Sequence, residues 1–154
     1  MIPELVALIG ALHRVLPPGV HWATFAEVGE RFAYNERRKW LFEGIERVGR
    51  ALASAGCRTM YVGGSFASSK DEPADFDGCW EAAGVKADRL DPILLDFGPG
   101  RRRQKRVYHG EMFISAAGTR SGETFLEFLQ VDKHTGAGKG VLAIDLTKLD
   151  VFAA

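Results

Sequence analysis

MYVGGSFASSKDEPADFDGCW, residues 60–80, carries two strand patterns joined by a polar loop. The first pattern belongs to CRTMYVGG (57–64), which is rich in β-forming residues and ends at two glycines. The second, DFDGCW (75–80), alternates two aspartates with aromatic residues, which is the period of a strand. The loop between them holds glycine, serine and acidic residues. It is therefore either a plain polar turn or a site for a charged ligand.

The two aspartates predict a cation site. In an extended strand, Asp75 and Asp77 point to the same face with Cα atoms about 6.6 Å apart, so their carboxylates can converge. At a separation of about 4 Å and an effective dielectric constant of about 20, the two charges repel by about 4 kcal/mol. Protonation of one acid would relieve this repulsion. A divalent cation relieves it better, because Mg²⁺ prefers carboxylate oxygens and substrate phosphates.

The glycine pair predicts a phosphate site beside that cation. Gly63 and Gly64 have no Cβ to keep a phosphate away from the backbone, and Ser65 adds a hydroxyl and an amide. Ser68 and Lys70 lie in the same loop, where they either contact phosphate or are simply solvated. A turn that holds phosphates beside acids that hold their metal is what phosphoryl and nucleotidyl transfer require.

The run VGGSFASSKDEPADFDG (62–78) resembles the signature of the polymerase-beta-like nucleotidyltransferase superfamily. In that signature a strand enters Gly-Ser at a helix start, and an Asp-hydrophobic-Asp strand follows about ten residues later. NERR (35–38) before a long helix, and KG and IDL near the end of the chain, are similar to small bacterial members of the toxin–antitoxin type. Gly78 departs from the pattern, because a hydrophobic residue usually follows the second aspartate. A glycine there weakens the strand and leaves room for something to approach.

The resemblance implies a nucleotidyltransferase that uses Mg²⁺ or Mn²⁺ to move a nucleoside monophosphate from an NTP, with ATP expected, to a hydroxyl. The acceptor would be a protein, an RNA or a small molecule. Gly64 and Ser65 would bind the triphosphate, and Asp75 and Asp77 would bind the metal. The alternative is a non-catalytic nucleotide-binding or antitoxin-like partner subunit.

Active members of the superfamily present a third carboxylate from a later strand. The resemblance makes Glu111, in YHGEMFIS (108–115), the first candidate for this metal ligand and for activating the acceptor. Asp145, in AIDL near the end of the chain, is the second candidate, and its other interpretation is a polar residue on the outer face of the last strand.

The remaining patterns predict a single α+β domain (1–154) with a mixed sheet of about four strands and helices mainly on one face. A leucine-rich stripe predicts a helix over 4–16, within an N-terminal helical extension (1–34), and its members are Leu5, Leu8, Ile9, Leu12 and Leu16. The segment 20–32 is ambiguous, although Thr24 could cap a short helix there. Asn35 predicts the start of a long helix that ends before Gly56.

Further elements are expected beyond the loop. Asp91 and Pro92 start a helical pattern that GPG (98–100) breaks or kinks. Residues 122–131 fit either a helix or a strand, and 134–140 fit a loop, taken as a hairpin connection. A final strand is expected over 141–146.

The charge composition of the chain limits the kinds of partner that we expect. Twenty basic residues balance twenty acidic ones, so any electrostatic partnership must be local. No apolar run is long enough to span a bilayer and no leader is apparent, so we expect a cytoplasmic protein without membrane contact, as a homodimer or with a cognate partner protein. The spacing of Cys57 and Cys79 favours reduced buried thiols over zinc. RRRQKR (101–106) is either a solvated helix face or binds the phosphates of RNA or of a nucleotide. His109 could position a substrate, but it is expected to be structural or simply exposed rather than catalytic.

Overall fold

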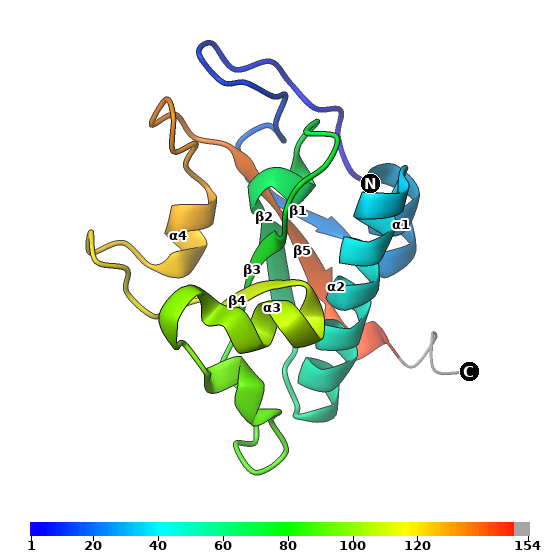
Figure 1. The fold of residues 1–154 in the computed structure, drawn as a ribbon, viewed down its shortest axis with the longest axis vertical. Coiled ribbons are helices and arrows are strands. Elements are labelled where there is room, and N and C mark those ends of the chain that lie inside the picture. Colours follow the sequence, from blue (N-terminus) through cyan, green and yellow to red (C-terminus); the bar gives the residue numbers. More distant parts are fainter. Residues whose placement is uncertain (150–154) are drawn as a thin grey trace.

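A five-stranded mixed sheet forms the centre of the computed structural model, which describes residues 1–149 (Figure 1). The sheet has the order β1-β5-β2-β3-β4. Its strands are β1 (Gly19–Ala23), β2 (Thr59–Gly63), β3 (Phe76–Trp80), β4 (Gly110–Ile114) and β5 (Gly140–Asp145). β1 runs parallel to β5, and β3 runs parallel to β4, whereas β2 is antiparallel to both of its neighbours. The α+β class is confirmed, with five strands rather than four.

The additional strand is β1, in the segment that the sequence left ambiguous. Its residues pair in parallel register with β5, far along the chain, so its strand conformation depends on a long-range partner that a local pattern does not contain. Directly after it, Thr24 caps α1 (Phe25–Phe32) in a capping box with Glu27, as its residue type allowed.

The predicted helix over 4–16 is wrong. In its place Val6 and Val15 pair across a loop, which we call the N-terminal loop (residues 6–15). Gly10 lies in this loop with φ of 86°, a left-handed conformation that glycine adopts without strain and that a helix interior does not permit. Of the expected stripe only Leu16 is fully buried, so a helix here would have found little apolar surface to cover.

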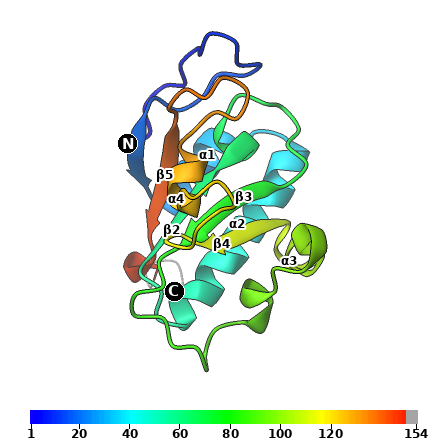
Figure 2. The same ribbon diagram turned by 90° about the vertical axis from the view of Figure 1, so that its left-hand side faces the viewer.

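Three helices cover one face of the sheet and a short one covers part of the other (Figure 2). α1, α2 (Glu36–Ser54) and α3 (Arg102–Tyr108) contribute to the larger apolar core, and α4 (Phe125–Leu129) contributes to the smaller one. The start of α2 at Asn35 and its end before Gly56, whose φ is 95°, are confirmed. Residues 122–131 thus contain a helix rather than a strand.

The segment 91–108 is broken, as its glycines indicated. Asp91 caps only a short 3₁₀ turn (Pro92–Leu95), and α3 begins after a kink at Gly100. The loop after α4 closes through a bridge between Val131 and Gly138, but β5 then pairs with β1 and β2. Cys57 and Cys79 are buried, as expected, and are not joined in a disulfide. Within residues 1–149, no helix combines the length and apolar character needed to cross a membrane.

Candidate functional site

The glycine bend and Asp77 are in direct contact. Gly63, the last residue of β2, is paired with Asp77 of β3, and the chain then turns through a 3₁₀ segment (Gly64–Ala67). Gly64 has a φ of 64°, and a Cβ there would collide with the Asp77 carboxylate. Glycine is therefore needed at this position for two reasons, its backbone conformation and the close approach of the acid.

Three carboxylates gather where β3 and β4 begin, and we call Asp75, Asp77 and Glu111 the acid cluster. Asp77 and Glu111 are direct partners in the parallel ladder, so their side chains lie on the same face. Asp75 lies in the bend before β3 rather than in the strand. The Nζ of Lys105 from α3 bridges two of these acids, at 3.4 Å from Asp75 Oδ2 and 3.1 Å from Glu111 Oε1.

The electrostatics of the acid cluster follow from burial and from this lysine. Burial, and then the negative charges of Asp75 and Glu111, raise the pKa of Asp77 to about 7. Burial also acts to raise the pKa of Glu111. Hydrogen bonds from Lys105 and Arg101 outweigh that effect and hold it below its usual value. Asp77 is thus the member of the cluster without an ion pair among residues 1–149, and the charge of Lys133 offsets the rise of its pKa only in part.

The carboxylate oxygens of the acid cluster suit a hard metal cation chemically. The ammonium group of Lys105, however, already lies between two of the three acids. Carboxylate oxygens are what Mg²⁺ and Mn²⁺ prefer. In residues 1–149, no three His, Cys, Asp or Glu side chains are arranged around a common point as metal ligands. The Lys105 ammonium stands between Asp75 and Glu111, so a metal held by all three acids would require Lys105 to move.

Beside Gly64 lies a cavity of about 380 Å³, which we call the basic pocket. The segment between β2 and β3, which we call the glycine loop (residues 64–75), contributes Ser65 and Ser68, and β3 contributes Asp77. Its basic side chains come from the glycine loop, the N-terminal loop and the segment after α4; they are Lys70, His13, Lys133, His134 and Lys139. None of the three lysines forms an ion pair with an acid among residues 1–149. The pocket therefore presents ammonium groups that are not held in ion pairs by the described residues.

Lys139 is a partly buried cation of this pocket. Burial lowers the pKa of Lys139, against an opposing effect of nearby Asp132. The Asp132 carboxylate is itself occupied, because it accepts hydrogen bonds from the backbone and hydroxyl of Thr135 at 2.9 and 2.8 Å. An anion entering the pocket would meet a partly desolvated ammonium group, where charge interactions are stronger than in water.

The N-terminal end of α2 holds the loop that connects β2 to β3. Arg38 is fully buried and donates hydrogen bonds to backbone carbonyls only, those of Phe32, Ser65, Phe66, Ser68 and Lys70. Arg37 donates to the carbonyls of Pro73 and Ala74, and Asn35 donates to that of Asp71. We call these three side chains the α2 clamp. It connects both ends of the loop to one helix, so Ser65 and Asp75 are positioned by the same rigid element.

Sequence reasoning did not identify Arg38, Lys105, Lys133 or Lys139 as site residues. NERR contributed only to the resemblance, and the segment 134–140 was interpreted as a connecting loop. A usable signal was present there, because lysine and histidine among glycines can form an anion-binding loop. Gly78 was interpreted as leaving room for something to approach, and the groups that approach it belong to the protein's own packing. A Cβ at Gly78 would lie 2.6 Å from the Tyr61 carbonyl oxygen and from Met112 Sδ, so the space is filled by packing.

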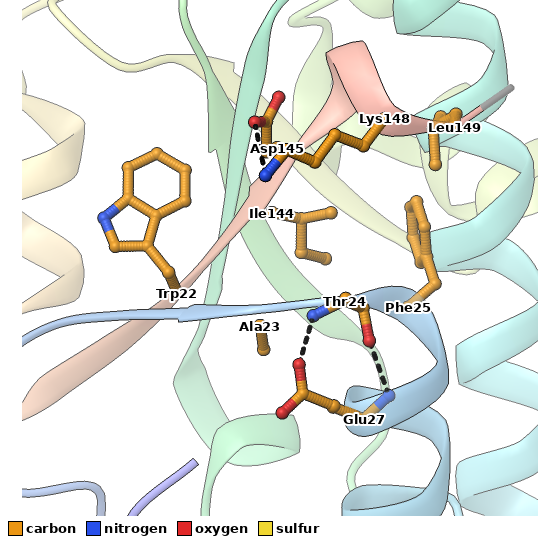
Figure 3. Close-up of a pocket in the computed structure, with 9 residues that line it drawn as sticks. All are labelled: Trp22, Ala23, Thr24, Phe25, Glu27, Ile144, Asp145, Lys148 and Leu149. Atoms are coloured by element: carbon orange, nitrogen blue, oxygen red, sulfur yellow. Dashed lines mark hydrogen bonds and ion pairs between the residues drawn. The ribbon is translucent and has the colours of Figure 1, made fainter. Parts of the chain in front are cut away.

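Asp145 lies away from the acid cluster. It is paired with Thr59 at the start of β2, whereas Asp77 is paired with Gly63 at the end of that strand. Asp145 lines a second cavity of about 390 Å³ near α1 (Figure 3). The polar groups of this cavity are largely occupied by their own chain. Thr24 and Glu27 bond each other in the α1 cap, and Asp145 accepts from Thr147 and lies 4.0 Å from Lys148.

In the basic run 101–106, some side chains form ion pairs with acids of the chain and others are exposed to solvent. Arg101 and Lys105 contact Glu111, and Arg103 pairs with Asp96 at 3.1 Å, so these side chains are not simply solvated. Arg102 and Arg106 are exposed. The His109 ring stacks on Trp40 with ring centres 3.6 Å apart and contacts the Trp40 carbonyl, which is a structural role, as expected.

Comparison with known proteins identifies a family. A family described as of unknown function (DUF6932) matches residues 11–145, a range that includes the acid cluster, the α2 clamp and the whole lining of the basic pocket. Neither the curated proteins nor the solved structures gave a match. Because the family match covers most of the chain, the protein belongs to the family of unknown function DUF6932.

Proposed function

We propose that the protein is a nucleotidyltransferase that transfers a nucleoside monophosphate from an NTP to an acceptor hydroxyl, with Mg²⁺ or Mn²⁺ as cofactor. The observation that carries this proposal is the position of Asp77. It lines the basic pocket and contacts Gly64, and it is electrostatically linked to Asp75 and Glu111. A group that holds a metal would thus lie directly beside cationic groups that hold phosphates.

Different residues would bind the metal and the phosphates. Asp75, Asp77 and Glu111 would hold the metal, which when bound supplies positive charge to the phosphates of the NTP. Ser65, the amides of the bend at Gly64, and the lysines of the basic pocket would hold the β- and γ-phosphates. Holding these groups supports catalysis because phosphoryl transfer depends chiefly on positioning and charge neutralisation.

In the transfer step, the acceptor oxygen bonds to the α-phosphorus and the bond from that phosphorus to the pyrophosphate oxygen breaks. Glu111 would activate the acceptor, because its carboxylate would accept the proton of the acceptor hydroxyl. Pyrophosphate leaves with the electron pair of the broken bond. The lysines of the basic pocket would stabilise its charge as it departs.

The proposal is tested by incubating the protein with α-labelled ATP, Mg²⁺ and a cell lysate. We expect label on a macromolecule or small-molecule acceptor and release of pyrophosphate, and no transfer by Asp77→Ala. Asp145→Asn is the matched control, because it removes an acid at the other end of the sheet and should leave labelling unchanged. Equal labelling by wild type and Asp77→Ala would refute the proposal.

A second function is favoured by the position of Lys105. Because its ammonium group lies between Asp75 and Glu111, the protein would bind nucleotide without transferring it if Lys105 stays there. The chain would then act as a nucleotide-binding or antitoxin-like partner subunit. Calorimetry with ATP together with an assay of pyrophosphate release distinguishes the two functions. A partner subunit binds ATP but releases no pyrophosphate at any Mg²⁺ concentration.

A further inference from the structure

The rim of the basic pocket carries large apolar side chains that are exposed. Leu12 of the N-terminal loop is 79% exposed, Phe128 of α4 is 46% exposed and Val131 just after α4 is 44% exposed. All three line the same cavity as the lysines and serines. Single exposed apolar residues are normal on a protein surface, but three around one cationic cavity form a mixed lining that is typical of small-molecule sites.

Backbone and side-chain hydrogen bonds join the N-terminal loop to the glycine loop. These contacts hold Leu12 close to the serines of the pocket. Val15 pairs with both Val6 and Ser68. The amide of Arg14 donates to Ser69 Oγ at 2.8 Å, and the amide of Ser69 donates to the Arg14 carbonyl at 3.0 Å. These contacts hold the base of the N-terminal loop against the segment that provides Ser65 and Ser68.

We propose that Leu12, Phe128 and Val131 bind the nucleoside portion of the nucleotide whose phosphates the basic pocket holds. This inference rests on the proposed function and adds the part of the site that contacts the base and sugar. A nucleotide has a charged tail and a planar, largely apolar ring. The cavity offers both kinds of group, because the three lysines and the three apolar side chains line it together, so each half of the ligand finds groups of matching chemistry.

The test compares a nucleotide with a ligand that has only the charged half. Binding of Mg²⁺-ATP and of Mg²⁺-tripolyphosphate to the full chain is measured by calorimetry for wild type, Leu12→Ala and Phe128→Ala. We expect wild type to bind ATP at least tenfold more tightly than tripolyphosphate. Leu12→Ala should weaken ATP binding about fivefold and Phe128→Ala about tenfold, because each removes apolar contact with the ring. Tripolyphosphate binding should change less than twofold.

Ile9→Ala is the matched control. Ile9 is in the same N-terminal loop and is 99% exposed, but it does not line the pocket, so its removal should change neither affinity. The inference is overturned if ATP and tripolyphosphate bind wild type equally, if Leu12→Ala and Phe128→Ala weaken both ligands alike, or if Ile9→Ala has the same effect as Leu12→Ala. In those cases phosphate binding, and with it the proposed function, still stands. If neither ligand binds wild type, both proposals fall.

Discussion

The acid cluster and the basic pocket share Asp77, but the chain treats their charges differently. In the acid cluster, Asp75 and Glu111 are neutralised from within, by Lys105 and Arg101 of the α3 region. In the basic pocket, Lys70, Lys133 and Lys139 form no ion pair with an acid among residues 1–149, although Asp132 and Asp77 lie close enough to Lys139 to favour its charged form. An anion entering the pocket therefore breaks no ion pair of these lysines, whereas a metal entering the acid cluster competes with a lysine. This difference predicts separate responses of the two regions to substitution and to ligands.

The largest effect is expected from the clamp that supports both regions. Arg38→Met should lower the free energy of unfolding by about 4 kcal/mol, because it leaves several buried carbonyls without donors. Denaturant unfolding measures this. Arg37→Met is the control, since Arg37 is only partly buried and donates to two carbonyls, and should cost about 1 kcal/mol. A cost below about 1 kcal/mol for Arg38→Met would show that the loop does not depend on the clamp.

The next effect is a pH dependence that originates at Asp77. Its pKa is about 7 in the folded protein, above the value of about 3.9 expected in the unfolded chain. The folded state thus binds more protons between these values, so this group lowers stability as pH rises from about 4 to 7. Asp77→Asn should be more stable than wild type at pH 8, by at most about 4 kcal/mol, and equal to it below pH 4.

Unfolding of wild type and Asp77→Asn at pH 4 and pH 8 checks this expectation. The difference between the two proteins isolates Asp77, because the other titrating groups are shared. If Asp77→Asn were the less stable protein at pH 8, the Asp77 carboxylate would have to be compensated by a contact that the structure does not contain.

In the basic pocket, Lys139→Met should affect ligand binding more than folding. Removing a partly buried cation that forms no ion pair among the described residues should change the free energy of unfolding by less than about 1 kcal/mol. The affinity for Mg²⁺-tripolyphosphate should fall about tenfold, measured by calorimetry. Lys148→Met, which removes an exposed lysine in the other cavity, should leave that affinity unchanged. Equal losses in the two variants would mean that the phosphates bind elsewhere.

The smallest effect is expected on Mg²⁺ binding to the acid cluster. Lys105→Met removes the cation that competes with a metal, so Mg²⁺ should bind about fivefold more tightly, as measured by calorimetry without nucleotide. Arg102→Met, an exposed cation in the same helix, should change Mg²⁺ affinity by less than twofold. Weaker Mg²⁺ binding to Lys105→Met would contradict competition between the lysine and the metal.

Local patterns predicted the parts of the structure that short-range physics determines. The caps at Thr24 and Asn35 and the contact between the glycine bend and Asp77 all depend on residues close together in the sequence. Strand β1 could not be predicted, because its conformation depends on pairing with β5. Three parts of the site were also hidden, because each lies far from the motif in sequence: Arg38, Lys105 and Lys139.

The central claim is that the acid cluster and the basic pocket act as one Mg²⁺-nucleotide site through Asp77. Its most direct test is the affinity for ATP with and without Mg²⁺, measured by calorimetry on wild type and Asp77→Asn. We expect Mg²⁺ to raise the ATP affinity of wild type at least tenfold and to have little effect on that of Asp77→Asn. The same enhancement in both proteins, or none in wild type, would contradict it.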